Sequence, residues 1–86
     1  MKPEIKILSH LIKQQCLCHI LIEARSAMIR QAELRARRQH VPADQIRLAR
    51  GGADRYALQM STRCMKVRDF EEALDIVREY VDIQII

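Results

Sequence analysis

Residues 16–29, CLCHILIEARSAMI, decide the expected fold because they are apolar on more than one side of a helix. One stripe with spacings of three and four contains Ile7, Leu8, Leu11, Ile12, Cys18, Ile22, Met28 or Ile29, and Ala32. A second stripe contains Leu17, Ile20, Leu21, Ala24 and Ala27. A helix that is apolar nearly all round must be covered on several sides, which a single neighbouring helix cannot do.

Outward from this segment, the sequence predicts one helix over residues 4–38. No Gly or Pro occurs between Glu4 and Val41, and Pro3 suits the first helical position. Arg35, Arg37 and Arg38 follow at the carboxyl end, where the helix dipole favours cations. Such a helix would be about 50 Å long, which exceeds the size of a compact domain of this length.

Three shorter elements are expected after the turn at Val41 and Pro42. Residues 43–50 form a short helix that Gly51 and Gly52 end. Residues 53–67 fit a helix or a strand, and their spacing favours the helix. Residues 69–82 form an amphipathic helix that begins with the capping pair Asp69 and Glu72. The apolar residues 83–86 are expected to be packed, either within the chain or as a strand on another chain.

These elements predict an all-α fold in a single domain, residues 1–86, with a long N-terminal helix and shorter antiparallel helices. The resulting helical hairpin would cover one face of the long helix, so it is expected to dimerise into a bundle. The partner is a second copy or a different helical protein. The expected dimer interface consists of Leu17, Ile20, Leu21, Ala24, Ala27 and Met28.

The composition excludes several classes of protein. The chain has 86 residues, of which 49% are hydrophobic, and two Gly and two Pro are too few for the turns of a many-stranded sandwich or barrel. The longest apolar run has seven residues and contains His19, so no membrane segment is predicted. No export signal is recognisable, and three cysteines, an odd number, favour a reducing compartment. The expected localisation is therefore cytoplasmic.

Charge is distributed unevenly along the chain. The net charge is +4, with ten basic and three acidic residues between positions 30 and 68, and one basic and six acidic residues after position 68. The basic belt consists of Arg30, Arg35, Arg37, Arg38, Arg47, Arg50, Arg55, Arg63, Lys66 and Arg68. It either balances the acidic last helix within the fold or binds an acidic partner. The predicted partner-binding residues are Arg35, Arg37, Arg38, Arg47 and Arg50.

Nucleic acid is the alternative partner for this belt. The sequence has no helix-turn-helix pattern and no zinc-finger spacing, and it has few aromatic side chains on which bases could stack. Any nucleic-acid binding would therefore be directed to the phosphate backbone, with little sequence specificity.

No residue pattern points to catalysis, a cofactor or a metal. Cys16 and His19 share a helix face, but Cys18 points away from it. His19 is expected to be a core or interface residue, and no phosphate-binding loop is present. An enzyme is the remaining alternative. In that case Arg25 and Arg30 would bind the two carboxylates of a dicarboxylate substrate. The favoured function is a non-catalytic helical protein-interaction module, such as a regulator, adaptor, inhibitor or chaperone-like subunit, with no small-molecule substrate.

Overall fold

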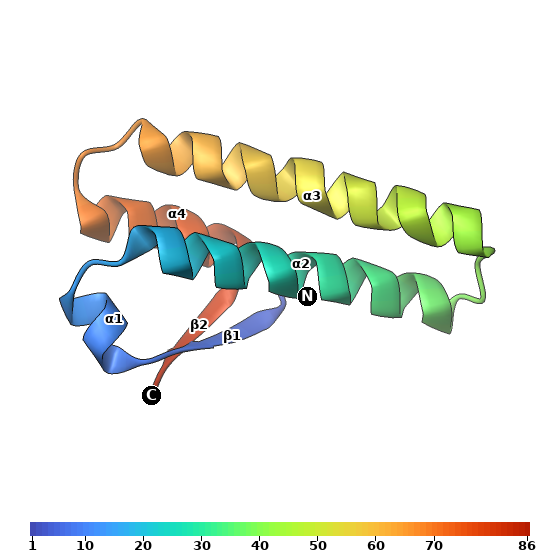
Figure 1. Cartoon of the computed structure of the whole chain (residues 1–86), viewed down its shortest axis with the longest axis horizontal. Coiled ribbons are helices and arrows are strands. Elements are labelled where there is room, and N and C mark those ends of the chain that lie inside the picture. Colours follow the sequence, from blue (N-terminus) through green and yellow to red (C-terminus); the bar gives the residue numbers. More distant parts are fainter.

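The computed structural model describes all 86 residues and is mostly helical, with 71% of the chain in four helices. The elements are β1 (Glu4–Ile7), α1 (Ser9–Lys13), α2 (Leu17–Arg38), α3 (Ala43–Met65), α4 (Phe70–Tyr80) and β2 (Asp82–Ile85). Helices α2 and α3 lie side by side along the longest axis, and residues 39–42 join them at one end (Figure 1). Helix α4 and the strands cover only part of this α2/α3 pair, so the part that ends in residues 39–42 projects beyond them (Figure 1).

The predicted helix over residues 4–38 is wrong in its first third. Glu4–Ile7 is a strand in which Ile5 and Ile7 are buried and the residues between them are exposed. This period of two matches a strand with one covered face. The backbone groups of the strand form hydrogen bonds with β2 instead of with residues four positions away, as they would in a helix. Gln15 then adopts a φ of 54°, in the left-handed region where a helix cannot continue. The long helix therefore begins at Leu17 instead of Glu4.

The apolar segment 83–86 pairs with β1 of its own chain. The strands are parallel, and their register places Glu4 beside Asp82 and Ile7 beside Ile85. At the two ends of the sheet, the backbone N–H of Asp82 donates to the carbonyl of Pro3 at 2.9 Å and the N–H of Ser9 donates to the carbonyl of Ile86 at 2.8 Å. The expected all-α class is thus correct for most of the chain but omits a two-stranded sheet.

Helix α3 is longer than predicted because Gly51 and Gly52 do not end it. Neither glycine has a positive φ, and the helix runs through both from Ala43 to Met65. The preference for helix over strand after residue 53 is confirmed. Its buried residues Ala57, Met60 and Cys64 follow helical spacing and belong to the main core.

The last predicted helix is confirmed as α4. The Asp69 side chain caps it by accepting a hydrogen bond from the backbone N–H of Glu71 at 3.3 Å. No side-chain bond from Glu72 completes a capping box. The buried face consists of Ala73, Leu74, Val77 and Tyr80. This face places α4 against both α2 and α3.

The residues predicted to form a dimer interface lie in the core of the single chain. Ile20, Ala24, Ala27 and Met28 are 0 to 6% exposed. Leu17 and Leu21 are partly buried against the same cluster. Most apolar side chains of residues 16–29 are covered within the chain, because α3 packs on one side of α2 while β1 and α4 pack on another, but Cys18 and Ile22 stay exposed. Four of the six residues are therefore used in the packing of the single chain, and Leu17 and Leu21 keep partial exposure.

Burial differs sharply between the two parts of the α2/α3 pair. In residues 30–53, called here the distal half, Ala36 is the one buried residue. The other buried residues of the pair lie outside the distal half and belong to the main core: Ile20, Ala24, Ala27, Met28, Ala57, Met60 and Cys64. None of the four helices combines the length and the hydropathy needed to cross a lipid bilayer.

Candidate protein-docking groove

A groove of about 810 Å³ opens where α4 meets the distal half. Its lining includes α2 residues on one side, α3 residues on the other, and the end of α4 with residues 1–3 as a wall. The residues of α2 and α3 are Met28, Gln31, Ala32, Arg35, Gly52, Ala53 and Tyr56. A second hollow of about 330 Å³ shares Gln31 and Arg35 with the groove and extends along α2 to Leu34 and Arg38. The floor is therefore made largely of small or apolar side chains, and its edge carries arginines.

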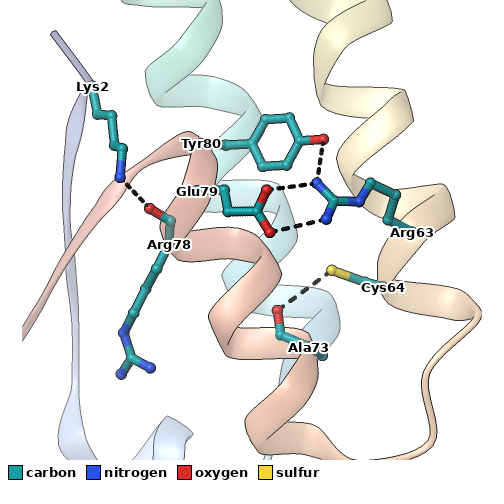
Figure 2. A network of polar contacts seen from close by, with 7 residues as sticks. All are labelled: Lys2, Arg63, Cys64, Ala73, Arg78, Glu79 and Tyr80. Atoms are coloured by element: carbon teal, nitrogen blue, oxygen red, sulfur yellow. Dashed lines mark hydrogen bonds and ion pairs between the residues drawn. The ribbon is translucent and has the colours of Figure 1, made fainter.

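The wall of the groove is held by polar contacts between α3 and α4. Arg63 donates two hydrogen bonds of 2.9 Å to the carboxylate of Glu79, and a third of 3.1 Å to the hydroxyl of Tyr80 (Figure 2). The rings of Tyr56 and Tyr80 lie 4.8 Å apart between their centroids. The hydrogen bonds from the Arg63 guanidinium lower the pKa of the Glu79 carboxyl, so Glu79 is ionised at neutral pH. Its negative charge is thus already paired.

Lys2 fastens residues 1–3 to the same wall. Its Nζ donates a 2.7 Å hydrogen bond to the carbonyl oxygen of Arg78, in the last turn of α4 (Figure 2). A cation at the carboxyl end of a helix is favourable because the carbonyl groups there carry partial negative charge. Nearby, the side-chain amide of Gln31 donates to the carbonyl of Met1 at 2.9 Å. Both contacts keep this segment at the edge of the groove.

Gly52 is the groove residue that the packing of the chain does not explain. A Cβ built at this position meets no atom within 4 Å, and its φ is negative. At Gly51, a Cβ would make an ordinary contact of 3.8 Å with Nη1 of Arg55. Glycine inside a helix destabilises it by about 1 kcal/mol relative to alanine. The missing side chain at Gly52 leaves the helix backbone open to close approach from the groove.

The five arginines predicted to bind a partner lie in the distal half but do not form one surface. Arg35 and Arg38 line the groove and its extension. Arg47 and Arg50 line a smaller hollow of about 210 Å³, which also contains Asp54. Arg37 donates to Glu33 at 2.8 Å, and Arg50 lies 3.8 Å from the same carboxylate. Arg35 and Arg38 are therefore the members of this set that belong to the groove.

The basic belt is only partly balanced within the chain. Arg63 is the one belt residue paired with the acidic helix α4, and Arg37 and Arg50 share Glu33. Internal balance therefore explains a minority of the belt. The belt residues without an ion pair are Arg30, Arg35, Arg38, Arg47, Arg55, Lys66 and Arg68.

Other residues considered for chemistry do not converge. The structure contains no group of three or more His, Cys, Asp or Glu side chains that could hold a metal ion. His19, expected in the core or an interface, is exposed and lies 3.9 Å from Glu23. Arg25 pairs with Asp54 at 2.6 Å, in a different hollow from the one that Arg30 lines. These two arginines do not face a common site that would clamp a dicarboxylate.

Several groove residues have no functional role in the sequence prediction. Glu79 and Tyr80 belong there only to the last helix, and Lys2 and Tyr56 have no role. Gly52 carried a usable signal, because a glycine pair inside a continuous helical pattern indicates either a stop or a site of close approach. The position of residues 1–3 depends on the sheet, which the all-α prediction did not include.

Comparison of the chain with protein-family models, with curated proteins and with solved structures found no match.

Proposed function

We propose that the chain is a non-catalytic protein-interaction module whose groove binds an acidic amphipathic helix of a partner protein. The observation that carries this proposal is the unequal covering of the α2/α3 pair. Part of the pair is covered by α4, whereas Ala36 is the one buried residue of the distal half. The groove begins where α4 ends, at Glu79 and Tyr80.

Helix α4 itself indicates which ligand such a surface accepts. It is amphipathic and has acidic residues in its first turn, and it packs against α2 and α3 through small and aliphatic side chains. An Arg of α3 fixes one of its carboxylates in bidentate geometry. A second helix of similar character, placed beyond the end of α4, would meet Ala32, Ala53 and Gly52 on the floor. Arg35 and Arg38 would then be available for its carboxylates.

The same features favour a protein helix over a small molecule or a flat surface. The groove is open and elongated by its extension along α2, and Gly52 removes the side chain that would hold a helix away from α3. Helix-in-groove recognition uses apolar anchors at helical spacing together with charges at the edge. The identity of the partner would decide whether the module acts as a regulator, adaptor, inhibitor or chaperone-like subunit.

The three cysteines are unpaired, which supports the proposed cytoplasmic location.

The test is a titration with a synthetic peptide of residues 69–82, which is an acidic amphipathic helix of known fit to this pair of helices. We expect saturable binding. In nuclear magnetic resonance spectra, the backbone amide signals of Ala32, Arg35 and Gly52 should shift as the peptide is added. Gly52→Leu should abolish binding because it fills the floor. Gly51→Leu is the matched control, since it adds the same side chain one position away and outside the lining of this groove.

Charge is tested by a second matched pair. Arg35→Gln should weaken binding of the peptide, whereas Arg37→Gln should not, because the Arg37 guanidinium already donates a hydrogen bond to Glu33.

Equal effects of the two glycine variants on peptide binding, or no saturable binding, would contradict the proposal that the groove is the binding site. If the chain binds a random DNA duplex more strongly than the peptide, and if its affinity for the duplex falls steeply as salt is added, the nucleic-acid alternative is supported instead.

A further inference from the structure

The outer edge of β2 presents unpaired backbone groups. The backbone N–H groups of Asp82 and Ile86 donate toward the β1 side, to Pro3 and Ile7, both at 2.9 Å. Because backbone groups alternate in direction along a strand, the N–H and C=O of Ile83 and Ile85 point to the opposite side. The sheet has two strands only, so no strand of the chain pairs with these four groups. They form an open edge.

The apolar side chains at this edge are incompletely covered. Ile85 is 51% exposed and Ile86 60% exposed, although Ile7, the partner of Ile85 in β1, is buried. Ile83 and Ile85 lie on the same face of the sheet as Ile5 and Ile7, because paired residues of parallel strands point to the same side. An exposed apolar edge strand favours pairing with another strand.

We infer that β2 pairs antiparallel with β2 of a second copy, which forms a continuous four-stranded sheet across a two-fold axis at Gln84. In this register, Ile83 lies opposite Ile85 of the other copy, and each such pair exchanges two hydrogen bonds. All four free groups of each edge are then used. The two Ile83–Ile85 contacts cover side chains that one copy leaves exposed.

The opposite edge of the sheet is a poorer candidate for the same pairing. On β1 the outward backbone groups belong to Glu4 and Lys6, whose charged side chains are typical of edges that avoid association. The isoleucines of β1 are buried already, so pairing there would cover no additional apolar surface of them. No residue of β2 lines the docking groove, so the edge and the groove are separate surfaces.

Cysteine cross-linking tests the register. In a background with Cys16 and Cys18 replaced by serine, Gln84→Cys places two thiols at a non-hydrogen-bonded pair, with Cα atoms about 4.5 Å apart. That separation suits a disulfide. Asp82→Cys is the matched control on the same face of the same strand, and its two copies would lie roughly 13 Å apart. We expect oxidised glutathione to convert the Gln84→Cys protein to a covalent dimer while the Asp82→Cys protein remains monomeric. Equal cross-linking of both variants, or none, overturns the proposal.

Sedimentation equilibrium tests the association without added cysteines. The unaltered chain should show a concentration-dependent dimer, and Ile85→Lys should weaken it by at least about tenfold, because two-fold symmetry applies each substitution twice. Met65→Lys is the control, since Met65 is 84% exposed and is the last residue of α3, which is not part of the sheet. Circular dichroism establishes that both variants remain folded. A chain that is monomeric at all concentrations, or a dimer that Ile85→Lys leaves unchanged, also overturns the proposal.

Discussion

Arg63 of α3 binds Glu79 of α4 through both carboxylate oxygens, Nη1 to Oε1 and Nη2 to Oε2, each at 2.9 Å. The same guanidinium lies with its central carbon 5.7 Å from the centre of the Tyr80 ring. A planar cation can make these contacts at once, whereas an ammonium group cannot make the paired hydrogen bonds. This pair fixes the end of α4 that forms the wall of the groove.

Arg63→Lys should therefore lower the urea midpoint of unfolding modestly, because it keeps the charge but loses the bidentate geometry. Arg78→Lys is the matched control. Arg78 lies 3.3 Å from the exposed carboxylate of Asp75 in the same helix, and such pairs contribute little to stability. Equal midpoints for the two variants would contradict a structural role for the Arg63 geometry.

Stability should decrease in acid through the same pair. The hydrogen bonds from Arg63 lower the pKa of Glu79 in the folded chain, so the ionised carboxylate favours folding at pH values above its unfolded pKa of about 4.3. This contribution is lost as the pH falls through the folded pKa. The pKa values of Asp54 beside Arg25 and of Glu33 beside Arg37 are also lowered, so these carboxylates contribute to stability with the same dependence on pH. Urea midpoints should be level above about pH 5 and fall below about pH 4. Glu79→Gln should make that fall shallower, and an unchanged profile would contradict the assignment.

Ile20 should behave as a core residue of one chain rather than an interface residue. It is fully buried, so Ile20→Ala should lower the free energy of unfolding by about 2 to 5 kcal/mol. Ile22→Ala is the control in the same helix. Because Ile22 is 57% exposed, this substitution should lower the free energy of unfolding far less. Urea denaturation measures both. Similar losses at the two positions would show that α2 is not oriented as described.

The two glycines of α3 should each accept alanine with a gain in stability. The added Cβ meets no atom within 4 Å at Gly52 and only an ordinary contact at Gly51. Each replacement should stabilise the chain by about 0.5 to 1 kcal/mol, measured by urea denaturation, because alanine restricts the unfolded chain more than glycine does. A loss of stability at either position would indicate a packing constraint that the structure does not contain.

The three cysteines should differ in reactivity toward a thiol reagent such as dithiobis(nitrobenzoate). Cys18 is exposed, Cys16 is partly buried and Cys64 is buried. Burial also raises the pKa of the Cys64 thiol, which makes the reactive thiolate scarcer. We expect rapid labelling of Cys18, slower labelling of Cys16, and labelling of Cys64 only when the chain unfolds. Single serine variants assign each phase, and rapid labelling of Cys64 would contradict its position.

The sequence predicted the elements whose signals are local. Asp69 and the spacing of Ala73, Leu74 and Val77 identified α4, and the same kind of spacing favoured helix after residue 53. The glycine pair misled the prediction because helix propensity is a weak preference that the surrounding helical sequence overrides. Of the arginines predicted to bind a partner, Arg35 lines the groove and Arg38 lines its extension. The other residues of the groove come from segments that become neighbours after folding.

The sheet could not be predicted with the same methods. The alternation of Ile5 and Ile7 is only four residues long, and it merges with an apolar pattern that also fits a helix. What distinguishes the two is pairing with residues 82–85, which is a non-local contact. The same gap explains why residues that pack within the chain were assigned to a dimer interface, because β1 is one of the elements that cover α2. Without that strand, α2 loses one of the three elements that cover its apolar residues, and only α3 and α4 remain.

The parallel pairing of β1 with β2 also determines the order in which the molecule can fold. The paired segments lie near opposite ends of the described chain, so closing that loop costs more chain entropy than forming any contact between successive helices. The α2/α3 pair needs only the reversal at residues 39–42. Helical structure should thus appear first, and the strands should join last as the slow, topology-limited event.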